Sequence, residues 1–535
     1  MRSCLCVVAV ASFLLNLEGI DTKMGAKCCK EEPFLVGEEN LYTHLVRDQS
    51  RNFHDVYDVV KIIGHGSIST ISKIKKKRSN GDNTKTRPHL YYVLKEIDTS
   101  VIEANRIDEL ENELTLLKAL DHPNIIKVYE TYKLNNRKAM VLELCTGGDL
   151  YTRHPYSEKQ AAKIIKECLS AISYLHSHKV IHRDIKYENI MFESKKTDAR
   201  VKLIDFGLSK CFWHNNQILT GQIGTLYTMS PQVIKGVYTA QADLWSIGVV
   251  TFMLLSGSDP PFWGHSLQTI ISQVMNSQVV FKGNTWKTRS NESKHFVKSL
   301  LKVNPKLRLT AVAALKHPWL SKEIDFSDEE PDAELLSDVK SNLIHYAAND
   351  NFKRIALNII AKNSNTEEIC ELRKVFDEFD TDHVGSISFQ EFKLSLRKLG
   401  HFEKHKIKAV FDKLDVNESG VIMYTEFLAA ALEAQGRIND VRIKEAFDVL
   451  DSNGTGFISA EDLRKVLGIK CSDTYIDEII KSADIDGDGQ ISYDDFKQHF
   501  EQQYHGKDKG IVQKGQRSRR SNDTHKSPVR SRGNI

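Results

Sequence analysis

The sequence lacks a hydrophobic run long enough to cross a bilayer. None of its 535 residues belongs to a stretch of roughly 18 to 20 consecutive apolar residues, the length that a transmembrane helix requires. The nine cysteines are scattered and odd in number, which argues against a disulfide framework and favours free thiols in a reducing compartment. The formal net charge is only +3, so charge gives no reason to expect nucleic acid as a partner.

What the sequence contains is typical of a globular protein with several domains. Hydrophobic residues make up 41% and charged residues 27% of the chain. A length of 535 residues predicts two to four domains. Residues 504–535 carry many Lys and Arg and almost no large apolar residue, so we expect a basic, disordered tail, with a specific docking element as the alternative.

The first 56 residues form an N-terminal extension with two interpretations. Residues 1–20 resemble a short secretory signal, with one Arg followed by an apolar run. In "MGAKCCK", a start at Met24 would instead expose Gly25 for myristoylation, with Cys28 and Cys29 available for palmitoylation. Cys29 stands where the myristoylation pattern has Ser or Thr. We expect the start at Met24, residues 1–23 being a gene-model extension or a minor form, and a cytoplasmic protein attached to a membrane by acylation.

Four carboxylate-rich segments repeat in the C-terminal half. They read "DTDHVGSISFQE" from 380, "DVNESGVIMYTE" from 415, "DSNGTGFISAED" from 451 and "DIDGDGQISYDD" from 484, with spacings of 35, 36 and 33 residues. So many like charges would repel one another unless a cation bound there. Each segment has Gly at its sixth position, where the chain must turn sharply, and Ile at its eighth. The Ile predicts a short strand that pairs one loop with the next.

These segments are identified as EF-hand calcium loops, which predicts an all-α domain of two paired lobes over 366–435 and 436–503. Val384 removes a ligand from the first loop, so a structural hand that binds no calcium is the alternative there. Asp462 and Asp495 are shorter than the usual Glu at the twelfth position and predict weaker calcium binding or access for magnesium. The predicted ligands are Asp380, Asp382, Ser386, Glu391, Asp415, Asn417, Ser419, Val421, Glu426, Asp451, Asn453, Thr455, Phe457, Asp462, Asp484, Asp486, Asp488, Gln490 and Asp495.

A second group of motifs occupies residues 57–320. Apolar residues alternate around Gly64 and Gly66, as in two strands joined by a loop whose backbone can approach phosphates. Lys95 lies on an apolar strand, where a charge needs a partner, and Glu113 lies in a helical pattern that can supply one. "HRDIKYEN" at 182–189 and "DFG" at 205–207 follow.

The order and spacing of these four motifs resemble the eukaryotic protein kinases, which implies a bilobal α+β fold, ATP and Mg²⁺. By that resemblance Asp184 accepts the proton of the substrate hydroxyl, Asn189 and Asp205 hold magnesium, and Lys186 marks the serine/threonine class. Asp243 would brace the catalytic loop. The residues expected to bind ATP are Ile63, Gly64, Gly66, Ile71, Lys95, Glu113, Glu143 and Cys145.

Several positions depart from the kinase pattern. Ser69 replaces the third loop glycine, Tyr187 replaces a Pro, and Gln232 replaces a Glu, so that Gln232 can offer Arg308 only a hydrogen bond. A pseudokinase scaffold is therefore the alternative to an active kinase. In the activation segment, the candidate phosphorylation sites are Thr220 and Thr225. Where related kinases read a basic residue near the phosphoacceptor, this chain has Asp149 and Glu188, whose alternative role is that of solvated carboxylates.

A junction over 321–365 links the two halves. Its second part shows helical apolar spacing at 352, 355, 357, 359 and 360. A kinase, such a junction and four hands in this order resemble the calcium-dependent protein kinases. That resemblance implies a calcium-activated serine/threonine kinase acting on protein substrates, in which the junction helix blocks the substrate site until the hands bind calcium and grip it. A spacer helix and a calcium buffer are the alternatives.

Overall fold

The computed structural model describes residues 45–500, except 50, 67–68, 78–89, 102–103, 135, 213–216, 277–278, 324–331, 398–403, 435–437 and 468–471. The predicted lipidation site at Gly25, Cys28 and Cys29 and the basic tail lie outside the described residues. In the described part of the chain, none of the helices has the length and apolar character needed to cross a membrane.

The small lobe of the kinase domain is a six-stranded sheet with one helix. The strand order is β1-β5-β6-β4-β3-β2, and only β1 runs parallel to its neighbour. The core on one side contains buried Tyr57, Ile74, Leu94 and Val141. The elements are β1 (Arg47–Gln49), β2 (Tyr57–His65), β3 (Ser69–Lys76), β4 (Tyr91–Asp98), α3 (Ala104–Ala119), β5 (Val128–Leu134) and β6 (Arg137–Leu142).

The large lobe is mainly helical. Ser157 and Gln160 form a capping box at the start of α4, which fixes where this helix begins. α6 is buried along its whole length and ends at Gly257 in the left-handed conformation. The helices are α4 (Glu158–Ser177), α5 (Pro231–Ile234), α6 (Gln241–Ser256), α7 (Leu267–Asn276), α8 (Asn291–Leu300), α9 (Ala311–Leu315) and α10 (Pro318–Glu323).

Short strands and 3₁₀ turns shape the loops of the large lobe. The strands are β7 (Val180–Ile181), β8 (Ile190–Phe192), β9 (Val201–Leu203), β10 (Lys210–Cys211), β11 (Leu219–Thr220) and β12 (Val237–Tyr238). The 3₁₀ turns of the chain are η1 (Phe53–Asp55), η2 (Thr99–Val101), η3 (Tyr187–Asn189), η4 (Leu226–Thr228), η5 (Thr285–Lys287) and η6 (Pro305–Leu307).

The junction contains two helices rather than one. α11 (Ala333–Tyr346) ends before a turn, and α12 (Asn351–Asn363) begins after Asp350. The Asp350 side chain accepts a hydrogen bond from the backbone N–H of Lys353 at 2.8 Å, which makes it the N-cap of the second helix. Every residue of α12 from Phe352 to Lys362 is buried, so this helix is enclosed on all sides.

The four hands form two lobes, each paired through a short two-stranded sheet. Ile387 pairs with Ile422 and Ile458 with Ile491, which confirms the pairing predicted from the eighth loop position. The first lobe contains α13 (Thr366–Phe379), β13 (Ser386–Ser388), α14 (Phe389–Arg397), α15 (Lys404–Leu414), β14 (Val421–Met423) and α16 (Tyr424–Ala434). The second contains α17 (Asp440–Leu450), β15 (Phe457–Ile458), α18 (Ala460–Leu467), α19 (Asp473–Ala483), β16 (Ile491–Ser492) and helical residues 493–500.

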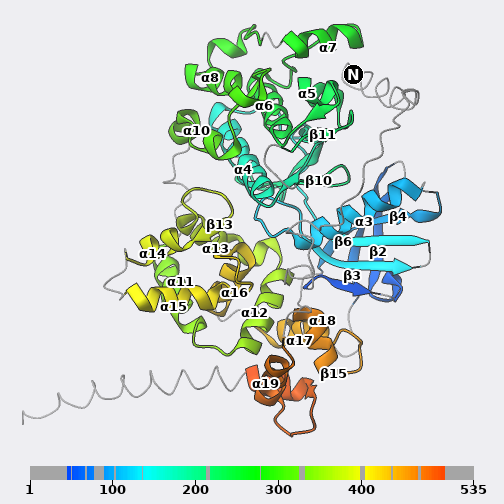
Figure 1. Cartoon of the computed structure of the whole chain (residues 1–535), viewed down its shortest axis with the longest axis vertical. Helices are drawn as coiled ribbons and strands as arrows, with labels where there is room; N and C mark the ends of the chain where they lie inside the picture. Colours follow the sequence, from blue (N-terminus) through cyan, green and yellow to red (C-terminus); the bar gives the residue numbers. More distant parts are fainter. Residues whose placement is uncertain are drawn as a thin grey trace, which may run out of the picture.

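The two EF-hand lobes occupy different places beside the kinase (Figure 1). The first lobe lies below the large lobe, and the second lies below the strands of the small lobe. α12 lies between them and packs on α16 of the first lobe and α17 of the second. β11 and α5, which belong to the activation segment, lie on the opposite side of the kinase from these helices.

Candidate functional site

The two lobes of the kinase domain bring together a chain of three charges. Lys95 on β4 places its Nζ 2.5 Å from a Glu113 oxygen on α3 and 3.4 Å from Asp205 Oδ1. The predicted Lys–Glu pair is therefore formed. Burial alone would lower the pKa of Lys95, but the two carboxylates outweigh it and raise that pKa above its ordinary value. The ammonium stays charged and can face nucleotide phosphates.

Asp184 lies at the centre of a second set of polar contacts. Its Oδ2 accepts from Lys186 Nζ at 2.6 Å and from Asn189 Nδ2 at 3.0 Å, and its Oδ1 accepts from Thr225 Oγ1 at 2.7 Å. Asp243 accepts from the backbone N–H of His182 and of Arg183 at 3.0 Å each, so it braces this loop as predicted.

These contacts change the interpretation of Thr225. The sequence offered it as a phosphorylation site, whereas its hydroxyl here contacts the carboxylate of Asp184 and the ammonium of Lys186. A phosphate on Thr225 would bring further negative charge against Asp184. Thr220, by contrast, lies exposed on β11.

Other residues predicted to bind ATP lie on strands of the same sheet as Lys95, and Ile71 pairs directly with it. Ile63 and Gly64 lie on β2 and Ile71 on β3, where Gly64 pairs with Ile71. The backbone N–H of Gly66 donates to the Ser69 carbonyl at 2.7 Å, and a Cβ on Gly66 would meet Ser69 Oγ at 2.7 Å. A side chain at position 66 would therefore require the Ser69 hydroxyl to turn away.

The hinge segment at Glu143 and Cys145 shows a role that the sequence did not reveal. The Glu143 side chain lies 3.0 Å from Lys202 Nζ on β9 of the kinase, and it accepts from Thr366 Oγ1, at the start of α13 in the regulatory half, at 2.6 Å. Burial would raise the pKa of Glu143, but the nearby lysines dominate and lower it to about 2. The carboxylate is thus charged and joins the hinge to α13.

The departures from the kinase pattern are accommodated locally. Arg308 Nη2 donates to Gln232 Oε1 at 3.0 Å, which is the hydrogen bond predicted in place of an ion pair. Burial lowers the pKa of Arg308 to about 9. Tyr187 is fully buried, and its ring packs edge-on against Tyr151 at 4.9 Å. The contacts given above for Asp184 and Lys95 include none with Gln232, Arg308 or Tyr187.

The two acidic residues predicted to contact a basic residue of the substrate, Asp149 and Glu188, are partly exposed. Glu188 accepts a hydrogen bond from the Tyr227 hydroxyl at 2.7 Å, and Asp149 accepts from Thr152 Oγ1 at 2.8 Å. Each carboxylate thus has a neutral partner.

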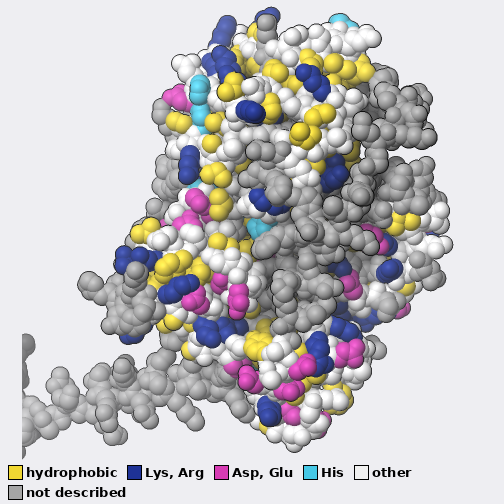
Figure 2. All heavy atoms as spheres, in the orientation of Figure 1, with side chains coloured by type: hydrophobic (Ala, Val, Ile, Leu, Met, Phe, Trp, Pro, Cys, Tyr) yellow, Lys and Arg dark blue, Asp and Glu magenta, His cyan; other side chains and the backbone are white. Residues whose placement is uncertain are grey.

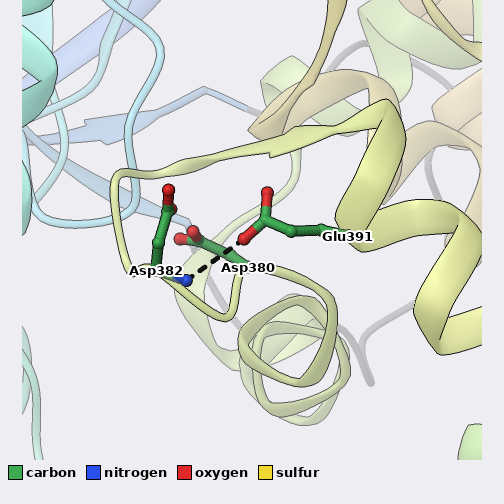
Figure 3. Close-up of side chains that lie close together, drawn as sticks. All are labelled: Asp380, Asp382 and Glu391. Carbon is green, nitrogen blue, oxygen red and sulfur yellow. Dashed lines mark hydrogen bonds between the residues drawn. The ribbon is translucent and has the colours of Figure 1, made fainter.

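The first calcium loop brings three carboxylates together. Oxygen atoms of Asp380, Asp382 and Glu391 all lie within 4.8 Å of one another, and Figure 3 shows them pointing toward a common centre. Glu391 Oε1 also accepts from the backbone N–H of Asp382 at 3.1 Å. Asp380 is only 3% exposed, and burial raises its pKa well above the ordinary value. Three converging carboxylates fit a divalent cation, despite Val384 at the fifth position. Ser386 follows on β13.

The second loop has a fully buried carboxylate at its twelfth position. Glu426 accepts from the backbone N–H groups of Val416 and Met423 at 2.8 Å each, and burial raises its pKa well above the ordinary value. Ser419 donates its hydroxyl to the Val421 carbonyl at 2.9 Å. Asp415 and Asn417 accept from the Ser419 backbone N–H at 2.8 and 3.1 Å. The oxygen atoms of the second loop are therefore ligands of the kind that calcium prefers.

The third and fourth loops have the same design with a shorter twelfth residue. Asp462 and Asp495 are both buried, and each accepts from the serine three positions earlier at 2.6 Å. In the fourth loop the oxygens of Asp484, Asp486 and Asp488 lie within 4.8 Å of one another, near an end of the molecule that carries several acidic side chains (Figure 2). The other predicted ligands of these loops are Asp451, Asn453, Thr455, Phe457 and Gln490, of which Phe457 is exposed on β15.

The first EF-hand lobe docks on the kinase behind the hinge. Arg373 on α13 forms two hydrogen bonds with Glu193, at 2.6 and 2.8 Å, and Arg200 pairs with Asp377. Asp121 accepts from the backbone and the hydroxyl of Thr425 at 2.8 and 2.6 Å. Sequence reasoning did not find these residues, because each is an ordinary charged residue within its own segment.

Comparison with known proteins agrees with both halves of this structure. The protein kinase domain model matches residues 57–320, and the model of an EF-hand domain pair matches 369–432 and 440–501. Calcium-dependent protein kinase 3 of Oryza sativa subsp. japonica is 34% identical over 399 residues, which cover 73% of this chain and 71% of the relative. Calcium-dependent protein kinase 33 of Arabidopsis thaliana is 34% identical, with 73% and 75% covered.

A third relative extends the match over more of the chain. Calcium-dependent protein kinase SK5 of Glycine max is 33% identical over 456 residues, which cover 84% of this chain and 87% of the relative. The matched region includes kinase and EF-hands together, as the structure does. The pseudokinase alternative is not favoured, since the charged residues that surround the cleft are all present. The chain belongs to the calcium-dependent protein kinase family.

Proposed function

We propose that this chain transfers the γ-phosphoryl group of ATP to Ser or Thr of protein substrates, and that calcium binding to the EF-hands permits the transfer. The observation that carries this proposal is that one chain combines an assembled Lys95–Glu113–Asp205 set with EF-hand lobes that enclose α12. An assembled Lys–Glu pair is required for catalysis in protein kinases.

The residues of the cleft have distinct roles in this proposal. ATP with Mg²⁺ supplies the phosphoryl group, and the oxygens of Asn189 and Asp205 would hold the metal. Lys95 orients the phosphates, while Lys186 offsets negative charge beside Asp184. Asp184 takes the proton of the substrate hydroxyl, which would displace the Thr225 hydroxyl from Oδ1. Thr225 thus holds the catalytic carboxylate in place while no substrate is bound.

Regulation in this proposal is a movement of the junction. In this structure the hands enclose α12, and Phe352 packs edge-on against Phe496 at 5.5 Å. The helix lies on the opposite side of the kinase from β11 and α5 (Figure 1), which supports an arrangement in which α12 does not cover the substrate site. We infer a second arrangement, without calcium, in which α12 leaves the hands and covers the substrate site. Calcium shifts the balance by no more than the difference in its affinity for the two arrangements.

Three finer features belong to the same proposal. Asp149 and Glu188 would contact a basic residue near the phosphoacceptor, and the partial exposure of both side chains supports this. Thr220 is an exposed candidate for phosphorylation. Acylation at Gly25, Cys28 and Cys29 would attach the chain to a membrane, and two acyl chains rather than one make such attachment stable.

One assay tests the catalytic part of the proposal. Phosphorylation of a peptide by the full chain is measured with magnesium-ATP, with and without micromolar calcium, beside Asp184→Asn and the exposed control Asp58→Asn. We expect calcium-dependent transfer in the wild type and the control, and a loss of about a thousandfold or more in Asp184→Asn. Transfer that survives in Asp184→Asn would remove the role of this residue. Equal rates with and without calcium would remove the regulatory role of the hands.

A second measurement tests the movement of the junction separately from chemistry. Hydrogen exchange of residues 351–363 is followed in chelator and in saturating calcium. We expect slower exchange with calcium, because the hands then enclose the helix. Equal protection in both conditions would contradict the proposed movement. If protection changes while no condition supports transfer, the chain is a calcium-switched scaffold instead.

A further inference from the structure

The chain before the kinase motifs adds a strand to the small lobe. β1 lies parallel to β5 at the edge of the sheet, with Asp48 opposite Thr131. The sequence assigned this region to an N-terminal extension, yet Leu45 and Val46 are only 1% and 3% exposed. Residues 45–49 are therefore part of the folded lobe.

The side chain of Asp48 joins this strand to α3. Its Oδ1 accepts a hydrogen bond from Lys118 Nζ, in the last turn of α3, and another from Thr131 Oγ1 on β5. The Lys118 side chain is 15% exposed and that of Asp48 73%, so the aliphatic part of Lys118 is covered while its ammonium meets the Asp48 carboxylate at the surface of the lobe. The hydroxyl of Thr131, which is itself buried, fixes the direction of the Asp48 carboxylate.

Apolar contacts support the same connection. Leu45 and Val46 belong to one continuous hydrophobic core with Leu116 and Leu117, which lie between Thr115 and Lys118 in α3. All four side chains are at most 3% exposed. Buried apolar groups thus stand next to the ion pair in both segments, just before the strand and in the last turn of α3.

The position of α3 determines the geometry of the nucleotide end of the cleft. Glu113 of this helix pairs with Lys95, and Asn112 Nδ2 donates to the Ser209 carbonyl, just after the DFG motif, at 3.0 Å. Lys118 lies five residues further along, which is about 7.5 Å at the rise of an α-helix. Fixing Lys118 therefore limits how far the helix can pivot and carry Glu113 away from Lys95.

We propose that Asp48 is a positioning residue for phosphoryl transfer, which holds α3 so that Glu113 stays against Lys95. This inference rests on the proposed kinase function. Asp48 contacts neither the nucleotide site nor the substrate side, and acts only through Lys118 and Thr131. The segment that precedes the kinase motifs thus takes part in the activity of the small lobe.

The test is a double-mutant cycle in the full chain at saturating calcium. Its members are Asp48→Ala, Lys118→Ala, both together, and the charge-swapped Asp48→Lys with Lys118→Asp. We expect each single change to lower kcat by about fivefold and to raise the KM for ATP, with faster hydrogen exchange in α3. The double change should be no worse than either single one, and the charge swap should recover most of the activity. The matched control is Asp58→Ala, which breaks the exposed Asp58–Lys77 pair of 3.7 Å on the same lobe.

Three other outcomes overturn the inference. If Asp48→Ala matches Asp58→Ala in the KM for ATP and in α3 exchange, the strand does not position the helix. If the charge-swapped variant stays as slow as the single variants, the Asp48–Lys118 ion pair is not what connects β1 to α3. A lower melting temperature with unchanged kcat per folded molecule would assign Asp48 a purely structural role. Failure of the wild type to transfer phosphate would remove the proposed function, while α3 exchange would still test the hold on this helix.

Discussion

The two EF-hand lobes contact the kinase in different ways. In the first lobe, Arg373 pairs with Glu193, and their side chains are only 3% and 8% exposed. In the second lobe, Glu445 on α17 lies 3.6 Å from Lys76 on β3, and the side chains are 19% and 36% exposed. A buried pair with two hydrogen bonds resists separation, whereas a half-exposed pair is screened by water and salt. The first lobe is therefore anchored on the kinase, whereas the second contacts the kinase through a weaker pair and is joined to the first lobe by Arg442 and Glu368.

The cavities at the two interfaces between the kinase and the EF-hand lobes also differ in size. A cavity of about 10 Å³ lies beside the first lobe, where Asp121, Glu143 and Thr366 meet. A cavity of about 90 Å³ lies between the small lobe and the second EF-hand lobe. A polar cavity of this volume has room for water, so direct protein–protein packing is less complete at the second interface than at the first. Side chains of both charge signs line the larger cavity. They are the basic Arg47, Arg51, Lys76 and Arg442 and the acidic Glu130, Glu445 and Asp448.

The calcium loops of the two lobes differ in the same way, because one packs on the kinase and another is exposed. A Cβ on Gly385 of the first loop would meet His122 of the kinase at 2.0 Å, so the loop packs directly on the kinase. In the fourth loop Asp486 and Asp488 are exposed. A lobe that is free to open is suited to sensing calcium, because sensing requires two arrangements of similar energy. We infer that the second lobe moves first and that the first lobe keeps the domains together.

Glu193→Ala gives the largest effect expected at this interface. It leaves the Arg373 guanidinium buried without its partner, which destabilises a docked state by about 3 to 5 kcal/mol. Hydrogen exchange of α13 in saturating calcium measures the loss of protection. The double change Glu193→Met with Arg373→Met should restore much of it, because no uncompensated charge then remains. Protection in Glu193→Ala equal to that in the wild type would show that the first lobe is not anchored by this pair.

Asp121→Ala should have the next largest effect. The change removes the acceptor for the Thr425 backbone N–H and hydroxyl, and each buried donor without a partner costs about 1 to 3 kcal/mol. We expect faster exchange in α16, measured under the same conditions. Thr425→Val removes only the hydroxyl and should give a smaller loss. If the two variants lose equal protection, the backbone hydrogen bond contributes nothing to docking.

The pH dependence of docking should follow Lys127, which faces Glu143, Lys202, Lys362 and Asp121. Burial, as the main cause, lowers the pKa of Lys127 from 10.5 to about 7. Between these pH values, undocking takes up a proton, so the docked state gains stability as pH rises, by roughly 1 kcal/mol per pH unit. Hydrogen exchange of α13 at pH 7.5 and 8.5, corrected for the intrinsic rate, checks this: the protection factor should rise by about tenfold between the two pH values. Lys127→Met should abolish the slope, and an unchanged slope in that variant would contradict the assignment.

The sequence predicted those parts of the site whose signals are local. Each calcium loop is a run of twelve residues, and the strand pairs at Ile387 and Ile458 follow from one position in that run. Lys95, Asp184 and Asp205 belong to short motifs with fixed spacing. The break between α11 and α12 was missed, although Asp350 in "AANDN" is a typical N-cap residue that could have indicated it.

The docking surface could not be predicted in this way. Glu193 and Arg373 are 180 residues apart, and neither belongs to a motif. The Glu143 side chain could point to the cleft or away from it, and only the position of Thr366 shows which. Nothing in the pattern around Asp48 indicates that it reaches Lys118. Contacts between distant segments depend on the packing of whole domains, which one sequence does not reveal.

Lys76→Ala should have the smallest effect, and it is the sharpest check on the comparison of the two lobes. The pair with Glu445 is 3.6 Å long and half-exposed, so its loss should change the stability of docking by less than about 1 kcal/mol. We expect hydrogen exchange of α17 to stay within error of the wild type, and added salt to remove any residual difference. A loss of protection as large as that in Glu193→Ala would mean that the second lobe is anchored as firmly as the first. The calcium sensor would then have to act through a movement of both lobes together.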